Sequence, residues 1–200
     1  MNRSQITELH NIMLIANLPS VLKYGILSHN KIKGMPHDSI AMPEIQDRRQ
    51  QRAVPGGRPL HDYANLYFHA RNPMMYLRRN QHLNLCILRI GLEVLDLPNV
   101  VIADRNASTE YVRFAAAPGG LSLVNYDQVF ARDWNHADPI EKAEHKAVKC
   151  AEVLVPDRIE PKFILGCYAS CPESYSSLIK FLSSYDQLEI ALNGDLFFNE

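Results

Sequence analysis

The sequence lacks the features of a membrane, secreted or strongly charged protein. No apolar run reaches the roughly 20 residues that a membrane-spanning helix needs, and the opening segment MNRSQITELHN has no apolar core of the kind found in signal peptides. The formal net charge is -1, so no overall positive field indicates a nucleic-acid partner. We therefore expect a cytoplasmic protein with no membrane partner, in which any nucleic acid is held by a local basic patch.

Cysteine is too sparse and too irregularly spaced to indicate a metal site. Of the 4 cysteines, Cys167 and Cys171 are spaced as C-x3-C, but no second pair stands at the spacing of a zinc site. In a reducing compartment such cysteines remain thiols. We expect free thiols at Cys86, Cys150, Cys167 and Cys171, and no bound metal.

Several common catalytic motifs are missing as well. The sequence contains no phosphate-binding G-x-x-x-x-G-K-[ST], no dinucleotide-binding G-x-G-x-x-G, no G-x-S-x-G nucleophile elbow and no H-E-x-x-H zinc motif. Its 8 histidines are scattered singly. These absences argue against P-loop, Rossmann, α/β-hydrolase and zincin chemistry.

What is present fits one domain of mixed α+β class spanning residues 1–200. A chain of 200 residues with 46% hydrophobic content can bury a sizeable core, and no repeat or shift in composition divides it. Apolar alternation and β-branched runs predict strands at 11–17, 64–70, 99–104, 149–156, 163–170 and 188–192. Capping residues and helix formers predict helices at 18–25, 72–81, 139–147 and 173–185.

Three segments are less regular. Residues 34–60 are rich in Pro, Gly, Gln and Arg, which predicts a long surface loop or flap. Residues 84–97 fit a strand or a buried helix equally well, because periodicity does not separate the two. Residues 105–118 suggest a turn followed by a short helix or an irregular segment.

Glu152 is the strongest single candidate for chemistry. It interrupts the otherwise apolar segment KCAEVLVP, and strand alternation places it on one face with Cys150 and Leu154. A carboxylate in such a strand can stabilise a developing positive charge or act as a general base. The alternative is an edge-strand glutamate that faces water.

Two further groups of residues are candidates for a binding site. Asp62 and Tyr63 precede the strand at 64–70 and Arg71 follows it, so a charge pair and aromatic rings could line one pocket, or form a structural ion pair with core aromatics. Arg48 and Arg49 suit phosphate recognition, because guanidinium groups present forked donors. Loop arginines that merely face solvent are the alternative.

Taken together, these motifs resemble the DarT family, the DNA ADP-ribosyltransferase toxins of toxin-antitoxin systems. The resemblance runs over nearly the whole chain and is carried by NLPSVLKYGIL (Asn17 to Leu27), the Arg48-Arg49 pair, LHDYANLYFHARNPMMY (Leu60 to Tyr76), VVIADRNAS (Val100 to Ser108) and KCAEVLVP (Lys149 to Pro156). It implies an ADP-ribosyltransferase-like fold, with two packed β-sheets, flanking helices and an NAD cleft. It also implies transfer of ADP-ribose from NAD to a base of single-stranded DNA, with release of nicotinamide and without a metal.

The resemblance assigns roles to individual residues. Glu152 would be the catalytic glutamate, and Arg49, in preference to Arg48, the arginine at the NAD phosphate and the reaction centre. The residues implied to line the NAD site are His10, Asn11, Asn17, Arg48, Tyr63, Tyr67 and Arg71. Residues 127–149 match the substrate-recognition loop of the family, in which Arg132, Trp134 and Lys146 would contact the DNA strand.

Departures from the family pattern leave the acceptor open. Lys149-Cys150 stands where the family often has Arg-Gln, and the branches of the family modify either thymidine or guanosine. We favour thymidine and keep guanosine as the alternative. A transferase that acts on RNA or protein, and a catalytically silent module that binds nucleotides or nucleic acids, are the competing hypotheses. The implied partner is a cognate macrodomain antitoxin, similar to DarG, that removes the modification.

Overall fold

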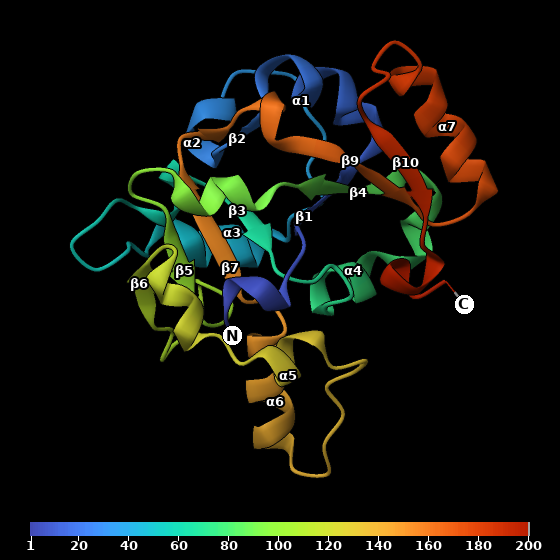
Figure 1. The fold of residues 1–200 in the computed structure, drawn as a ribbon. Helices are drawn as coiled ribbons and strands as arrows, with labels where there is room; N and C mark the ends of the chain where they lie inside the picture. The colour runs from blue at the N-terminus through green and yellow to red at the C-terminus, as the bar shows by residue number, and fades with distance from the viewer. Residues whose placement is uncertain (200) are drawn as a thin grey trace.

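The computed structural model describes residues 1–199 and has the predicted α+β class, with helices on both sides of a large sheet (Figure 1). Its strands are β1 (Leu9–Leu14), β2 (Ile26–Leu27), β3 (Tyr63–Tyr67), β4 (Leu85–Ile90), β5 (Val101–Ala103), β6 (Phe114–Ala116), β7 (Glu152–Pro156), β8 (Arg158–Ile159), β9 (Ile164–Ala169) and β10 (Glu189–Leu192). Its α-helices are α1 (Leu18–Tyr24), α2 (His29–Ile32), α3 (Pro43–Gln50), α4 (Pro73–Arg78), α5 (Tyr126–Phe130), α6 (Pro139–Val148) and α7 (Pro172–Leu182).

Local sequence signals explain where several helices begin and end. Asn72 caps α4, since its side chain accepts hydrogen bonds from the backbone N–H groups of Met74 and Met75. Asp138 caps α6 in the same way through the N–H of Ile140. Helix α1 ends at Gly25, which has φ of 85° and passes so close to the Ile159 carbonyl that a Cβ would lie 2.1 Å from its oxygen. Helices α4 and α6 therefore begin, and α1 ends, within one residue of the predicted positions, whereas α4 ends at Arg78, three residues before the predicted end.

Eight strands form one sheet in the order β10-β9-β4-β1-β3-β7-β5-β6, and β2 and β8 pair separately. The sheet register brings one residue of each strand into a single transverse row. Neighbouring members of this row are directly opposite one another, and in order they are Glu189, Gly166, Arg89, His10, Tyr67, Glu152, Ala103 and Phe114. Opposite residues share a face of the sheet, so polar side chains far apart in the sequence converge along one line.

The two halves of this sheet are joined weakly. Strands β1 and β4 pair along six residues and β3 and β7 along five, whereas β1 and β3 share only the pair His10 and Tyr67. Beyond that pair, the side-chain amide of Asn11 donates to the Asn65 carbonyl at 3.2 Å. The family resemblance implied two packed sheets; in the structure the two large halves form one eight-stranded sheet and meet at a single residue pair, with β2 and β8 as a separate two-stranded sheet.

The main core lies on the face opposite the polar row. Strand residues such as Leu9, Leu66 and Val153 pack there against Leu18 of α1 and Leu178 of α7. On the row's own face two smaller apolar clusters form, one around Met75 and Phe197 at the β4 side and one around Leu60 and Leu154 at the β5 side. The polar residues in the middle of the row therefore lie between these two apolar clusters.

Two segments differ from the predictions made for them. Residues 34–60, predicted as a loop, contain helix α3, and residues 105–118, predicted as a turn with a helix or irregular chain, contain strand β6. Pairing with β5 overrides the helix propensity of the alanines in β6. The undecided segment 84–97 is strand β4 followed by a 3-10 helix at Leu92–Asp96.

Across residues 1–199, none of the helices has both the length and the apolar character that crossing a bilayer requires.

Candidate active site

The centre of the site is a buried ion pair between Glu152 and Arg49. Glu152 begins β7 and is 0% exposed, and the Nη1 of Arg49 donates to both of its carboxylate oxygens, at 3.1 and 3.0 Å. The backbone N–H of Ala107 donates to Oε1 at 2.9 Å. Because β7 lies between β3 and β5, the alternative of an edge-strand glutamate in water is wrong. Three hydrogen bonds satisfy a carboxylate whose burial would otherwise be costly.

The next two members of the row, on the β1 side of Glu152, are Tyr67 and His10. Tyr67 lies directly opposite Glu152 on β3, and His10 lies opposite Tyr67 on β1. Burial and the nearby Glu152 carboxylate raise the pKa of Tyr67 above its ordinary value. Tyr67 is therefore a neutral phenol beside the carboxylate. The structure thus brings Glu152, Arg49, Tyr67 and His10 together on one face.

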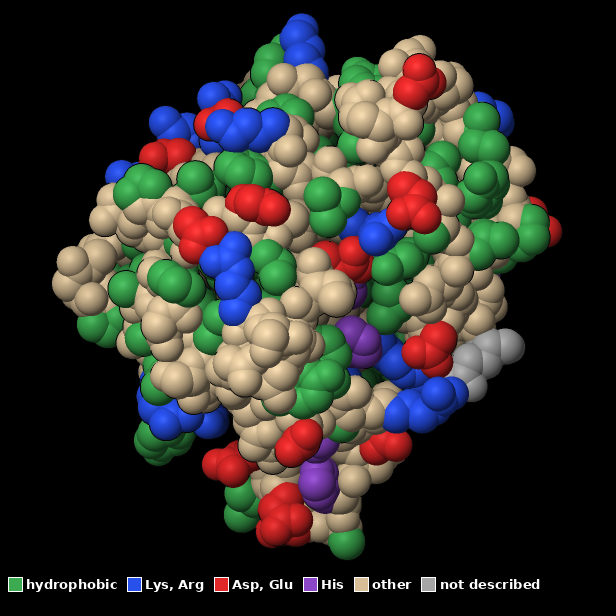
Figure 2. Space-filling model, viewed as in Figure 1, with side chains coloured by type: hydrophobic (Ala, Val, Ile, Leu, Met, Phe, Trp, Pro, Cys, Tyr) green, Lys and Arg blue, Asp and Glu red, His purple; other side chains and the backbone are tan. Residues whose placement is uncertain are grey.

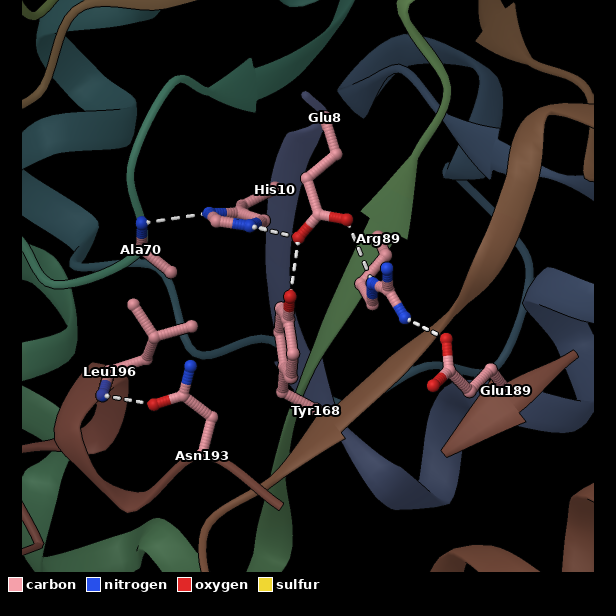
Figure 3. A network of polar contacts seen from close by, with 8 residues as sticks. All are labelled: Glu8, His10, Ala70, Arg89, Tyr168, Glu189, Asn193 and Leu196. Carbon is pink, nitrogen blue, oxygen red and sulfur yellow. Dashed lines mark hydrogen bonds and ion pairs between the residues drawn. The ribbon is translucent and has the colours of Figure 1, made fainter. Parts of the chain in front are cut away.

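His10 belongs to a second network, shown in Figure 3. The N–H of Ala70 donates to its Nδ1 at 3.1 Å, so Nε2 carries the proton and donates to Glu8 Oε1 at 3.0 Å. Glu8 also accepts from the Tyr168 hydroxyl at 2.8 Å and from Arg89 Nε at 2.8 Å. The tautomer and orientation of the His10 ring are consequently fixed from both sides.

The charges within this network reinforce one another. Burial by itself would raise the pKa of Glu8, but the hydrogen bonds from His10, Arg89 and Tyr168 outweigh it and lower the pKa to about 2. Burial and the bond to Glu8 raise the pKa of Tyr168 to about 12. Arg89 also donates to Glu189 at 2.5 Å. Glu8 is thus a buried anion held by three donors, next to the residue that we assigned to the NAD site.

Two basic side chains, the buried Lys149 and the half-buried His69, lie near the start of β7. Lys149 is 0% exposed, and its ammonium donates to the carbonyls of Val129 at 3.0 Å and Ala131 at 2.5 Å. Burial lowers the pKa of Lys149 to about 8. Burial and the positive charge of Lys149 lower the pKa of His69 to about 3, and the His69 ring lies 5.0 Å from that of Phe130. These contacts hold residues 129–131, at the end of α5, close to the site.

Other residues assigned to the NAD site lie further from Glu152. Arg48 is exposed on α3, where its guanidinium donates to the Glu44 carbonyl, so the structure places Arg49 and not Arg48 against the carboxylate. The side-chain amide of Asn17 donates to the Asp38 carbonyl at 2.7 Å and accepts from the Asp38 N–H at 3.1 Å. Tyr63 is buried in the apolar cluster at the β5 side.

Arg71 and the three residues assigned to DNA lie together in a different place. Arg71 is buried, bonds the Arg132 carbonyl at 3.1 Å, and contacts both the backbone and the carboxylate of Asp195. It lines a pocket with Trp134 and Lys146. Arg132 is exposed and pairs with Asp195 at 3.4 Å. The predicted DNA-contacting residues therefore cluster, and Arg71 joins them rather than the Glu152 pair.

Neither the polar partners of His10 nor Lys149 were predicted as residues of the site. Glu8 precedes His10 by two residues, so alternation alone places both on one side of the chain. No comparable local signal connects them to Arg89 on β4 and Tyr168 on β9, which come close to Glu8 only through the register of the sheet. Lys149 stands out in the sequence only as a departure from the family pattern.

The face seen in Figure 2 presents histidine near its centre, with acidic and basic side chains around it.

Within residues 1–199 no three side chains of His, Cys, Asp or Glu come together in a way that could hold a metal ion. Cys86, Cys150, Cys167 and Cys171 are free thiols that form no disulfide bond. Burial raises the pKa of Cys150 to about 12.

A family model described as "ssDNA thymidine ADP-ribosyltransferase, DarT" matches residues 10–198. The chain belongs to the DarT family. Among curated DarT relatives, a DNA ADP-ribosyl transferase of Thermus sp. (strain 2.9) is 32% identical over 162 residues, which is 74% of this chain and 74% of the relative. A transferase-glycohydrolase fusion protein of Thermosipho africanus is 30% identical over 185 residues, 88% of this chain, and the chain spans 46% of that longer protein.

Solved structures of DarT proteins confirm the fold. The Thermosipho africanus DarTG in complex with ADP-ribose superposes with a TM-score of 0.83 at 26% identity, covering 98% of this chain and 52% of that one. The Thermus sp. 2.9 DarT in complex with ADP-ribosylated ssDNA superposes with a TM-score of 0.83 at 24% identity, covering 98% and 99%. The predicted ADP-ribosyltransferase-like fold and the predicted family are both confirmed.

Proposed function

We propose that this chain is a toxin that transfers ADP-ribose from NAD to thymidine in single-stranded DNA and releases nicotinamide. The observation that carries the proposal is the buried Arg49 and Glu152 pair in a chain of the DarT family. In this transfer the bond from nicotinamide to the ribose breaks, and nicotinamide leaves with the electron pair. A ring nitrogen of the base forms the new bond to the ribose carbon and gives up its proton to the Glu152 carboxylate, which acts as a general base. The ribose gains positive charge as the bond breaks, and a fixed carboxylate stabilises that charge.

The arrangement around Glu152 suits this role. Arg49 and the Ala107 N–H hold the carboxylate in one orientation, so no reorganisation is needed when charge develops. Arg49 also supplies the positive charge that an NAD pyrophosphate requires. Glu152 and Arg49 are accordingly the proposed catalytic residues.

The remaining assignments are part of the same proposal. His10 and Tyr67 lie in the row beside Glu152, and they are the strongest candidates for contacts with the NAD ribose and nicotinamide. Asn11, which bridges the two halves of the sheet, and Asn17 would shape the rim of the NAD site. Residues 1–200 would act as one domain in the cytoplasm, where NAD and exposed single strands are both present.

A cognate enzyme that removes the modification completes the proposed system. The printed name of the Thermosipho africanus relative joins a DNA ADP-ribosyl transferase to a DNA ADP-ribosyl glycohydrolase. We expect an antitoxin of that activity, a macrodomain protein similar to DarG, to act together with this chain. It would limit the damage that the transferase causes to replicating DNA.

The test is transfer of label from NAD to defined acceptors. The protein is incubated with labelled NAD and separate pools of single-stranded DNA, duplex DNA, RNA and protein, with Glu152→Gln as the inactive control. We expect label on single-stranded DNA alone, and mass spectrometry of the oligonucleotide should place it on thymidine. Label on guanosine would replace the acceptor base, and label on RNA or protein alone would replace the substrate class. NAD binding without transfer to any pool would indicate a silent module.

A further inference from the structure

His10 has both of its ring nitrogens engaged within the protein. Its Nδ1 accepts the N–H of Ala70 and its Nε2 donates to the Glu8 carboxylate (Figure 3). Tyr168 packs against the same ring edge to face, with the ring centroids 5.9 Å apart and an interplanar angle of 79°. A molecule bound beside His10 would therefore contact the face of the imidazole ring, and the surrounding residues set the angle of that face.

Glu8 is a rigid partner for this ring. Its Oε2 accepts from Arg89 Nε and its Oε1 accepts from the Tyr168 hydroxyl, both at 2.8 Å. These donors lie on β4 and β9, so the carboxylate is fixed by two strands other than the one that carries His10. A carboxylate held in this way fixes both the tautomer and the orientation of a histidine, as it does beside metal ions and in catalytic triads.

His10 and Arg49 lie on opposite sides of Glu152. The chain that follows Arg49 runs along the β5 side, where Arg52 donates to the Thr109 carbonyl at 2.8 Å. His10 lies on the other side, two strands away in the order β1-β3-β7-β5, or roughly 10 Å when neighbouring strands are about 4.8 Å apart. With the NAD pyrophosphate at Arg49 and the ribose carbon at Glu152, the nicotinamide ring extends toward His10.

We propose that Glu8 is a positioning residue for NAD, which acts through His10 by fixing the ring face on which the nicotinamide group packs. Nicotinamide is a planar aromatic ring, and such rings stack on one another. This role rests on the proposed function and deepens it, because it names the residue that orients the leaving group. Glu8 itself touches neither NAD nor the acceptor base. ADP-ribose, which lacks nicotinamide, is bound independently of Glu8.

Glu8→Gln breaks this arrangement without removing the side chain. The amide has one oxygen for three donors, and the charged Arg89 is the strongest of them. The amide oxygen therefore turns to Arg89, and the NH2 group is left facing the N–H of His10 and the hydroxyl of Tyr168. Two donors that face one another cannot bond, so the His10 ring loses its support on this side.

Binding of two ligands that cannot react tests the role of Glu8. Carba-NAD, a non-cleavable analogue of NAD, keeps the nicotinamide group and ADP-ribose lacks it, and each is titrated calorimetrically into wild-type and Glu8→Gln protein. We expect Glu8→Gln to weaken carba-NAD binding about tenfold, the effect of losing one hydrogen bond to a charged group, and to change ADP-ribose binding less than about twofold. Tyr168→Phe removes one donor to Glu8 but keeps the bond to His10, so it should shift carba-NAD binding in the same direction by a smaller factor.

A double-mutant cycle with His10→Ala separates a role through His10 from a general loss of stability. In the His10→Ala background, Glu8→Gln should change carba-NAD affinity less than about twofold, because no ring remains to be positioned. It should still lower the stability of the fold, because Arg89 and Tyr168 lose the anion in both backgrounds. Leu178→Ala on α7 is the control, since Leu178 is buried in the main core. Its truncation destabilises the protein and should leave both affinities unchanged.

The outcomes separate this inference from the proposed function. Equal weakening of carba-NAD and ADP-ribose in Glu8→Gln would overturn the inference, because a loosened fold affects both ligands alike. Unchanged carba-NAD binding in Glu8→Gln, or a further tenfold loss in the His10→Ala background, would also overturn it, and transfer by the wild-type protein would leave the proposed function intact. Selective loss of carba-NAD binding in a protein that transfers nothing would support the role of Glu8 and contradict the proposed reaction. A wild-type protein that binds neither ligand would contradict both.

Discussion

Replacement of Glu8 by Gln tests whether the buried network beside His10 stabilises the site. The Glu8 side chain is 9% exposed and accepts hydrogen bonds from His10, Tyr168 and Arg89. Gln has nearly the same size, so Glu8→Gln removes the negative charge without creating a cavity. The amide also brings two N–H donors to a place where all three neighbours donate. The substitution should therefore destabilise the folded protein and loosen the His10 ring.

The size of the effect follows from the pKa of Glu8, which the network lowers from 4.5 to about 2. A carboxyl group whose pKa is lower in the folded state stabilises that state above its unfolded pKa, and this stabilisation is lost as the pH falls through the folded pKa. The difference corresponds to about 3 kcal/mol of unfolding free energy at neutral pH. Between pH 4.5 and about 2 this contribution should disappear from the wild-type protein.

Denaturant unfolding across this pH range measures the effect. At neutral pH we expect Glu8→Gln to be less stable than the wild type by about 3 kcal/mol, and the two stability curves to converge as the pH falls toward 2. Glu189→Gln is the matched control at the other end of the network. Its side chain is 67% exposed, so losing that ion pair should cost less than about 1 kcal/mol. Parallel acid limbs for the wild type and Glu8→Gln would refute the reasoning.

Three further predictions concern the site itself. Glu152→Gln should lower the rate of transfer at least about 100-fold while the protein keeps its fold by circular dichroism; transfer within a few-fold of the wild type would exclude Glu152 as the catalytic residue. Arg49→Lys should impair transfer strongly and its neighbour Arg48→Lys should not, because only Arg49 contacts the carboxylate; the reverse result in steady-state kinetics would exchange their roles. Lys149→Met should lower the unfolding free energy by about 2 to 4 kcal/mol, because the buried carbonyl of Val129 and the part-buried carbonyl of Ala131 lose their donor. The lowered pKa of Lys149 means that the unfolded chain binds more protons above about pH 8, so wild-type stability should gain a contribution between pH 8 and 10.5 that Lys149→Met lacks; identical alkaline curves would contradict it.

Glu152 could be singled out from the sequence as a candidate site residue because the signal is local. A single acid in an apolar, β-branched strand is costly unless it has partners, and the structure supplies those partners in Arg49 and Ala107. The choice of Arg49 over Arg48 rested on the family resemblance and could not come from the segment alone. Predicted as a loop, residues 34–60 had no helical phase from which to decide which arginine faces inward.

The same segment shows why α3 was missed. Its sequence PEIQDRRQ has almost no apolar face, so the usual periodicity is absent. The weaker signals are present, since Pro43 stands in the first turn, Glu44 is acidic near the N-terminus and Arg48 is basic near the C-terminus. What holds the helix in place is a polar contact, in which the buried Arg49 side chain bonds Glu152. A helix that is anchored by an ion pair and not by apolar side chains leaves no hydrophobic pattern in the sequence.

The Glu8 network could not be predicted because it depends on sheet register. Arg89 and Tyr168 reach Glu8 only when β4 is aligned on β1 and β9 on β4 in the observed way. A shift of β4 or of β9 by one residue would turn its side chain to the opposite face. Their sequence separations from Glu8 are 81 and 160 residues. No local pattern records contacts over such distances.

The position of the site follows from the same geometry. A regular sheet uses its backbone groups in strand pairing, whereas β1 and β3 pair only through His10 and Tyr67 and leave a place where side chains and a bound molecule can take over hydrogen bonds. Asn11 already does so through the Asn65 carbonyl. The polar row crosses the sheet at this junction, with Glu152 on one side and the Glu8 network on the other. A substrate bound there would contact both halves of the sheet, so substitutions that loosen either half should weaken its binding.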